Sequence, residues 1–207
     1  MVVRSPSSRL LVPGTTGWTA ADLDNPKIAP LWERGHYELV EGVLATMPAA
    51  YFDAGRALFK LAELISQFLK GRGTPGDFSF ETDLVLTPTR VPRPDAMLMT
   101  MEDLRKQRAL RARRRRGVRY GRVRVPPTLV IESVSIDHEA YDEVTKRGWY
   151  AEANIPNYWL LNAYRQSLQC LVLDGPDYRV DQTGRGKAKL RPSAFPGLVI
   201  PLADLWA

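Results

Sequence analysis

The sequence Leu129-Val130-Ile131-Glu132-Ser133-Val134 places one carboxylate inside a short, nearly all-apolar run. Such a run is typical of a strand that is buried on both faces of a sheet. A carboxylate is costly to bury unless it is paired or binds a metal ion, so Glu132 is a candidate site residue. The alternative is that Glu132 lies at a strand end and pairs with one of the many arginines.

Patterns on either side of this run predict a mixed fold. Apolar residues at three- and four-residue spacing indicate amphipathic helices, alternation indicates strands, and Glu41-Gly42 lies between two strand-like runs as a hairpin turn would. The fold class that follows is α/β (α+β), a central mixed sheet flanked by helices. We expect helices at 20–23, 54–70, 101–116 and 138–153, and strands at 37–40, 43–47, 78–86, 95–100, 129–134, 158–161, 168–173 and 178–180.

Two further residues are candidates for the same site as Glu132. Asp95 begins a predicted strand directly after Pro94, and Lys146 lies on the helix that follows the Glu132 strand. Asp142, Lys146 and Tyr150 are each four residues apart, so they lie on one helical face, where the alternative is an ordinary surface ion pair. Two carboxylates suit Mg²⁺ or Mn²⁺, and a lysine beside them suits hydrolysis of a phosphodiester.

The positive charge of the chain is concentrated in one segment. The whole chain has 29 Lys and Arg against 23 Asp and Glu, but eleven of these basic residues lie within 105–124, where there is no acid. The remaining 18 basic residues leave the rest of the chain at a formal −5. Such a basic segment is typical of phosphate binding, and the alternative is a solvated, poorly ordered loop. The candidate nucleic-acid-binding residues are Arg111, Arg113, Arg114, Arg115 and Arg116.

Composition excludes several other classes of protein. With one cysteine and two histidines, neither a disulfide framework nor a cysteine- or histidine-rich zinc site is expected. No apolar run has the length of a membrane span, and the first residues lack the apolar stretch of a signal peptide. We therefore expect a cytoplasmic protein with no membrane partner.

Several quoted stretches resemble the Uma-two family of restriction-endonuclease-like proteins, within the PD-(D/E)XK nuclease superfamily. The resemblance covers about residues 32 to 206 and is most specific between Glu132 and Leu161. It rests on Tyr37-Glu38-Leu39-Val40-Glu41-Gly42-Val43-Leu44, Met47-Pro48, Pro94-Asp95, residues 129–135, Tyr141-Asp142, Lys146, Tyr150-Ala151-Glu152-Ala153, Ile155-Pro156, Tyr158-Trp159-Leu160-Leu161 and residues 195–202.

The resemblance implies a restriction-endonuclease-like fold and a role for each matched residue. Asp95 and Glu132 match the family's two metal ligands, and Lys146 matches its catalytic lysine on the helix. Glu38 matches a further acid near the site, for which the alternative is a cross-strand surface pair. Residues 1–31 would be an N-terminal extension and residues 32–207 the nuclease domain, with a basic insert at about 105–124.

Two departures from the family pattern concern the site. Ala54 stands where members usually have a histidine, and Thr145 stands where many have an acid before the lysine. The expected function is a Mg²⁺- or Mn²⁺-dependent endonuclease acting on DNA. The alternative is a non-catalytic nucleic-acid-binding or assembly protein that retains the nuclease fold. Since an enzyme that cuts both strands commonly works as a symmetric dimer, we also expect a homodimer.

Overall fold

The computed structural model describes residues 10–47, 51–112, 121–135 and 139–207. The chain forms two compact units and crosses between them several times. The N-terminal unit consists of Met1–Ala49, Thr82–Arg93 and Gln107–Arg124, and the sheet unit consists of Ala50–Glu81, Pro94–Lys106 and Val125–Ala207. The expected boundary after residue 31 falls inside a helix of the N-terminal unit, and that division of the sequence stays a prediction.

The N-terminal unit contains helices α1 (Ala20–Leu23) and α2 (Ala29–Arg34) and the hairpin β1 (Tyr37–Val40) and β2 (Val43–Thr46). The predicted hairpin is confirmed, with Glu41 and Gly42 at its turn and both at positive φ, 49° and 77°. That conformation suits a two-residue turn between antiparallel strands and is easiest for glycine at the second position. The unit has its own core, made of Trp18, Ala20, Leu23, Ile28, Trp32, Leu39, Leu44 and Val91.

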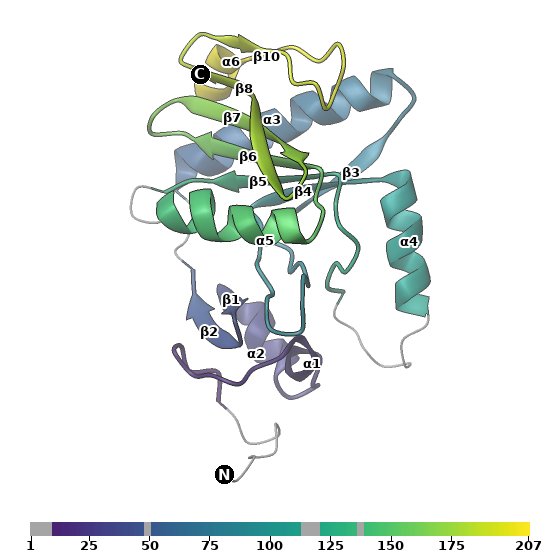
Figure 1. The fold of residues 1–207 in the computed structure, drawn as a ribbon, viewed down its shortest axis with the longest axis vertical. Coiled ribbons are helices and arrows are strands. Elements are labelled where there is room, and N and C mark those ends of the chain that lie inside the picture. The colour runs from purple at the N-terminus through teal and green to yellow at the C-terminus, as the bar shows by residue number, and fades with distance from the viewer. Residues whose placement is uncertain (1–9, 48–50, 113–120, 136–138) are drawn as a thin grey trace. The chain divides into compact units, whose positions relative to one another are not determined.

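The sheet unit is built on six strands in the order β3-β4-β5-β6-β7-β8 (Figure 1). β5 and β6 are parallel and every other neighbouring pair is antiparallel. A parallel pair needs a crossover connection, and helical residues 139–152 supply it. The strands are β3 (Gly76–Phe80), β4 (Ala96–Thr100), β5 (Leu129–Ser133), β6 (Asn157–Asn162), β7 (Ser167–Asp174) and β8 (Asp177–Arg185).

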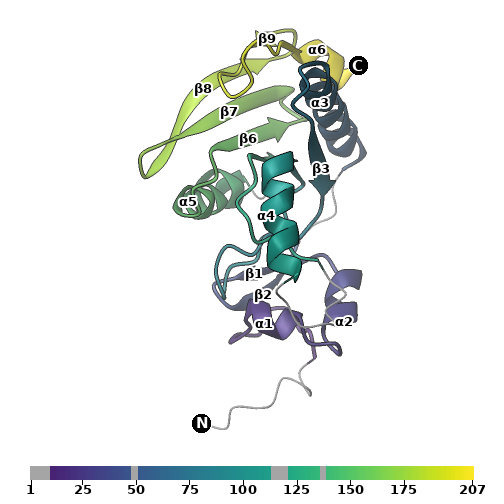
Figure 2. The same cartoon turned by 90° about the vertical axis from the view of Figure 1, so that its right-hand side faces the viewer.

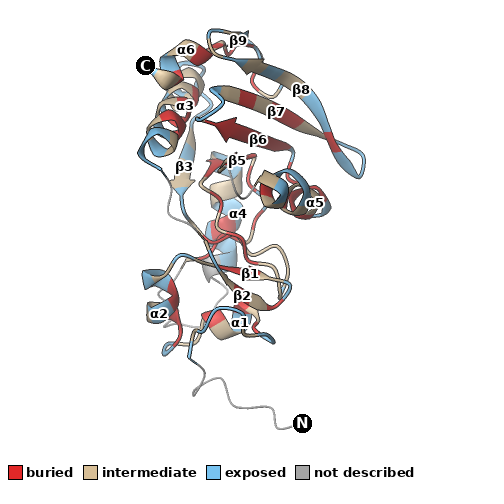
Figure 3. Cartoon of the chain, turned by 90° about the vertical axis from the view of Figure 1, so that its left-hand side faces the viewer, coloured by how far each residue is buried: buried red, intermediate tan, exposed pale blue. Residues whose placement is uncertain are grey.

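Helices cover both faces of this sheet (Figures 1 and 2). The long helix α3 (Phe52–Gly71) packs its apolar side on one face, and α5 (Arg147–Glu152) lies on the other. Besides α3, the first face is covered by the small pair β9 (Lys189–Leu190) and β10 (Ile200–Pro201) and by α6 (Leu202–Trp206). The central strands are buried along most of their length, as Figure 3 shows for β6. The expected central mixed sheet flanked by helices is confirmed.

Three of the expected elements differ in the structure. The strand predicted at 78–86 ends at Phe80, because Glu81 takes a positive φ of 44° and the chain leaves the sheet. The predicted helix at 101–116 is α4 (Met101–Ala112), and its expected last residues lie outside the described part. The helix predicted from residue 138 contains a π-helix, Tyr141–Lys146, before α5, and residue 138 lies outside the described part.

Candidate active site

Asp95 and Glu132 meet on neighbouring strands of the sheet unit. Ala96 on β4 stands opposite Ile131 on β5, so one step further along this antiparallel pair brings Asp95 opposite Glu132. Opposite residues of an antiparallel pair project from the same face of the sheet. The Asp95 N–H donates to Glu132 Oε2 at 3.4 Å, and the Ser133 N–H donates to Asp95 Oδ2 at 2.6 Å. The structure therefore brings these two predicted site residues together.

Lys146 and Tyr150 contact the other oxygen of the Glu132 carboxylate. Lys146 Nζ lies 3.0 Å from Glu132 Oε1, and the Tyr150 hydroxyl donates to the same oxygen at 2.6 Å. All three residues are buried, with Glu132 2% and Lys146 3% exposed. The cation that pairs with Glu132 is thus a buried lysine, and the alternative of a pair with an arginine at a strand end is wrong. The part played by Tyr150 was missed, although its four-residue spacing from Lys146 was a usable signal.

Asp142 adds a second carboxylate beside Lys146. Its Oδ1 lies 3.5 Å from Lys146 Nζ, and the Asp142 side chain is only 9% exposed. The alternative of an ordinary surface pair at this spacing is therefore wrong. The two residues belong to the π-helix, a wider turn than the expected α-helix, and such turns are often found at functional sites. Sequence spacing cannot distinguish the two forms of helix, because both place residues four apart on nearly the same side.

A cluster of tyrosines closes the buried side of the site. Tyr150 and Tyr158 meet edge to face with ring centres 5.1 Å apart, and Tyr178 packs behind Tyr158 at 5.7 Å. The Tyr158 hydroxyl donates to the backbone carbonyl of Asp142 at 3.0 Å. Burial, followed by the charge of Glu132, raises the pKa of Tyr158 well above its ordinary value. This phenol therefore stays a neutral donor that attaches the π-helix to β6.

The donor set fits a hard divalent cation. Asp95 and Glu132 offer carboxylate oxygens, which Mg²⁺ and Mn²⁺ prefer. Among the described residues, no three His, Cys, Asp or Glu side chains are grouped as a metal cluster. Mg²⁺ is commonly held by one or two carboxylates and completes its shell with water and substrate phosphate. Two carboxylates on one face of the sheet are therefore sufficient for such an ion.

Glu38, the further predicted acid, belongs to the N-terminal unit. Its side chain is buried, and Glu38 Oε1 accepts a hydrogen bond from the Arg93 N–H at 2.8 Å. Its partner across the β1–β2 hairpin is Ala45. The alternative of a cross-strand surface pair is therefore wrong for Glu38. The implied role of Glu38 in a catalytic site stays a prediction.

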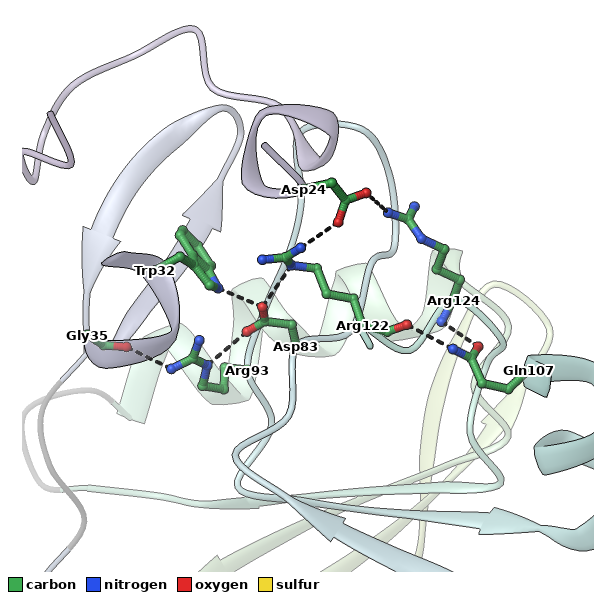
Figure 4. Close-up of polar contacts among 8 residues, drawn as sticks. All are labelled: Asp24, Trp32, Gly35, Asp83, Arg93, Gln107, Arg122 and Arg124. Atoms are coloured by element: carbon green, nitrogen blue, oxygen red, sulfur yellow. Dashed lines mark hydrogen bonds and ion pairs between the residues drawn. The ribbon is translucent and has the colours of Figure 1, made fainter. Parts of the chain in front are cut away.

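The end of the basic segment is buried rather than solvated (Figure 4). Arg122 is 3% exposed, and its guanidinium pairs with Asp83 at 2.9 Å and with Asp24 at 2.6 Å. Arg124 also pairs with Asp24, at 3.3 Å. The expectation of a solvated surface segment is wrong for Arg122, because acids distant in the sequence supply the counter-charge. Arg113, Arg114, Arg115 and Arg116 lie outside the described residues, as does the side chain of Arg111.

Asp83 is the centre of this polar network. It accepts hydrogen bonds from Trp32 Nε1 at 2.6 Å, from Arg93 Nε at 2.8 Å and from Arg122 Nε at 2.9 Å. The Gln107 side chain contributes at its edge, because its amide donates to the Arg122 carbonyl at 2.8 Å and accepts from the Arg124 N–H at 3.0 Å. The network joins the two ends of residues 108–121 within the N-terminal unit.

Comparison with known proteins agrees with this architecture. A crystal structure of a "putative nuclease belonging to DUF820" from Anabaena variabilis ATCC 29413 superposes with a TM-score of 0.61 at 14% identity, covering 82% of this chain and 89% of that one. No curated protein matches the chain. Of the helices in the described residues, none is both long and apolar enough for a membrane span. The sheet and its flanking helices thus define a protein with a nuclease fold.

The family follows from the sequence. The family model Uma2, described as "Putative restriction endonuclease", matches residues 29–203. The chain belongs to this Uma2 family, which confirms the resemblance that the Glu132 to Leu161 region indicated.

Proposed function

We propose that this protein is a metal-dependent endonuclease that hydrolyses phosphodiester bonds of DNA at Asp95, Glu132 and Lys146. The observation that carries the proposal is the meeting of these three groups. The Glu132 carboxylate accepts from the Asp95 N–H, the Asp95 carboxylate accepts from the Ser133 N–H, and a buried lysine lies 3.0 Å from Glu132. Membership of a family described as putative restriction endonucleases supports the same reaction.

Asp95 and Glu132 would hold the cation, and hydrogen bonds fix the orientation of both. The Ser133 N–H holds Asp95 Oδ2, while Tyr150 and Lys146 hold Glu132 Oε1. A bound Mg²⁺ or Mn²⁺ supplies an acidified water molecule and offsets negative charge on the reacting phosphate. Fixed carboxylates spare the protein the reorganisation that flexible ligands would require during the reaction.

Lys146 would place its positive charge beside the reacting phosphate. Glu132 and Asp142 both lie within ion-pair distance of its ammonium, so the charge is positioned before any substrate binds. A preorganised cation stabilises charge that develops in the transition state more effectively in a buried site than in water. Thr145 departs from the resemblance's pattern of an acid just before the lysine, and here the acid of the same helix that contacts the lysine is Asp142.

The proposal is tested by cleavage of supercoiled plasmid DNA with Mg²⁺ or Mn²⁺. The full chain should nick or linearise the plasmid, and Asp95→Asn and Glu132→Gln should reduce the rate by at least about a hundredfold. Calorimetric titration with Mn²⁺ should show binding that both variants weaken. Cleavage that survives both substitutions would place the reaction elsewhere or assign it to a contaminant. Metal binding without cleavage of any DNA would favour the non-catalytic alternative.

Sedimentation of the full chain tests the expected homodimer, because an enzyme that cuts both strands commonly works as a symmetric dimer.

A further inference from the structure

Four exposed basic residues alternate with other residues between the end of β8 and the residue after β9. They are Arg185, Lys187, Lys189 and Arg191, and we call them the basic edge. The residues between them point the other way, since Ala188 and Leu190 pack against the hydrophobic core. No acid occurs between Asp181 and Asp204. The alternation therefore concentrates positive charge on the outside of this part of the sheet unit.

The charges of the basic edge are not used to stabilise the fold. Some other exposed arginines of the sheet unit have acidic partners, as Arg165 has Glu139 at 2.7 Å and Arg179 has Asp174 at 3.3 Å. In the described part of the chain, no side chain of the basic edge takes part in an ion pair or hydrogen bond. Such unbalanced charge attracts an anionic partner and has no counterpart that a partner must displace.

Strand register places Arg185, the first residue of the basic edge, at the same end of the sheet as the candidate active site. Glu132 on β5 stands beside Leu160, Leu160 stands opposite Gln169, and Gln169 stands opposite Thr183. Arg185 follows two residues later on β8, the strand at the sheet's edge (Figure 1). Three strand spacings separate β5 from β8, which is roughly 14 Å at about 4.8 Å each. A DNA duplex covers that distance in about four base pairs, at about 3.4 Å each.

The side chain of Arg185 also lies on the same face as Glu132. A side chain at Gly184 would meet Leu190 and Leu202, so position 184 faces the hydrophobic core. Arg185 therefore projects from the opposite face, because successive strand residues alternate. Ile131 likewise belongs to that core, so the adjacent Glu132 projects from the opposite face too. Arg185 therefore lies on the same face as the carboxylates, and helical residues 139–152 lie on that face too (Figure 2).

We propose that the basic edge binds the phosphate backbone of the DNA whose reacting phosphate lies at Asp95 and Glu132, an inference that rests on the proposed function. An anionic membrane would also be attracted by exposed lysines and arginines. The end of the sheet that Arg185 shares with the carboxylates favours nucleic acid, because only an extended polyanion can occupy both sites at once. The surface would bind phosphates without selecting a base sequence.

The test measures binding of the full chain to a fluorescein-labelled DNA duplex in EDTA, over a series of NaCl concentrations. Arg185→Gln/Lys187→Gln removes one arginine and one lysine from the basic edge. The matched control is Lys70→Gln/Arg72→Gln, which removes the same two charges from the exposed C-terminal end of α3. Each lost phosphate contact should reduce the slope of log affinity against log salt by about 0.9. The quadruple variant of the basic edge should reduce it further.

A reduced slope in the basic-edge variant, with the control slope unchanged, supports the inference. Equal slopes in the two variants, or no binding of DNA by the full chain, overturn it. Vesicles containing phosphatidylserine serve as the second probe: loss of vesicle binding in the variant with unchanged DNA binding would assign the surface to membranes and also overturn the inference. Because EDTA prevents cleavage, the outcome is separate from catalysis. If the slope changes but the chain never cuts plasmid DNA, the proposed nuclease reaction is wrong and the proposed DNA-binding surface still holds.

Discussion

Glu132 is buried together with the groups that compensate its charge. Its carboxylate accepts hydrogen bonds from the Tyr150 hydroxyl and the Asp95 N–H, and Lys146 lies 3.0 Å away. Burying a carboxylate without such partners would cost several kcal/mol. This cost marked Glu132 as a site candidate in the sequence. The sequence did not identify Tyr150 as a partner, because helical spacing indicates a shared face and not which group that face meets.

Removing the Tyr150 hydroxyl should destabilise the protein measurably. Tyr150→Phe keeps the ring but removes the hydroxyl that donates to Glu132 Oε1 at 2.6 Å. A hydrogen bond to a charged group contributes about 1.5–3 kcal/mol, so unfolding in urea should require less free energy by about that amount. Tyr178→Phe is the control, since Tyr178 donates to the neutral carbonyl of Ile155 and should lose only about 1 kcal/mol. A smaller loss at Tyr150 than at Tyr178 would contradict this account.

Removing the Lys146 ammonium should lower the free energy of unfolding more than removing the Tyr150 hydroxyl does. Lys146→Met leaves two buried carboxylates, Glu132 and Asp142, without a cation between them. Breaking a buried ion pair from one side typically costs about 3–5 kcal/mol. Thermal or urea unfolding in EDTA should show this loss, and the double variant Lys146→Met/Glu132→Gln should recover part of it. If the double variant is destabilised by the sum of the two single effects, the pair does not interact as the structure indicates.

At the scale of elements, local patterns predicted those elements that bury one regular face. The β1–β2 hairpin, α3 and β5 occur where periodicity placed them. The strand predicted at 78–86 was too long. Apolar residues continue to alternate past Phe80, but the chain turns at Glu81 into the other unit. There Leu84 pairs with Val123 in an isolated bridge. Nothing local signals that change of partner, nor the π-helix at Tyr141–Lys146, which depends on contacts with distant residues.

The contact between Arg147 of α5 and Asp177 of β8 should make a contribution to stability that depends on pH. Arg147, which begins α5, holds the Asp177 carboxylate through two hydrogen bonds of 2.9 Å. These bonds, and then the Tyr178 N–H, lower the pKa of Asp177 below its ordinary value. Because the folded pKa is lowered, the stability that this contact contributes exists above the unfolded pKa and is lost as pH falls through the folded one.

Arg147→Gln should therefore raise the pKa of Asp177 toward its ordinary value. The measurement is an NMR titration of the Asp177 carboxyl carbon across the acid range. Arg179→Gln is the neighbouring control, since Arg179 lies 3.3 Å from Asp174, and it should leave the titration of Asp177 in place. A pKa for Asp177 that does not move in Arg147→Gln would show that the guanidinium is not its cause.

For the whole molecule, charge is distributed in two different ways. The basic edge carries exposed charge without acidic partners, whereas Arg93 and Arg122 of the N-terminal unit share the carboxylate of Asp83. The composition predicted concentrated positive charge within 105–124. It could not predict that Asp24 and Asp83 neutralise the end of that segment, because those acids lie far away in the sequence.

Asp83→Asn should destabilise the N-terminal unit. The substitution keeps the shape of the side chain but removes the negative charge that pairs with the buried Arg122 and the partly buried Arg93. The expected loss is about 3 kcal/mol in the free energy of unfolding, followed by tryptophan fluorescence in urea. Asp24→Asn is the control, because Asp24 is more exposed than Asp83, 13% against 5%, and its loss should cost less. An equal effect of the two substitutions would contradict the central place of Asp83.

The Gln107 side chain has a consequence for how the sequence can vary. Its amide pairs with the Arg122 carbonyl and the Arg124 N–H in the way that a peptide group of an adjacent strand would. Gln107 therefore holds the chain at 122–124 together with the ion pairs of Arg122 and Arg124 and the bridge between Leu84 and Val123. None of these contacts uses residues 113–116, so the sequence of 113–116 can change without removing one of them. A chain with a Gly-Ser replacement of 113–116 should therefore unfold at nearly the same urea concentration as the full chain, while Gln107→Ala should unfold at a lower one.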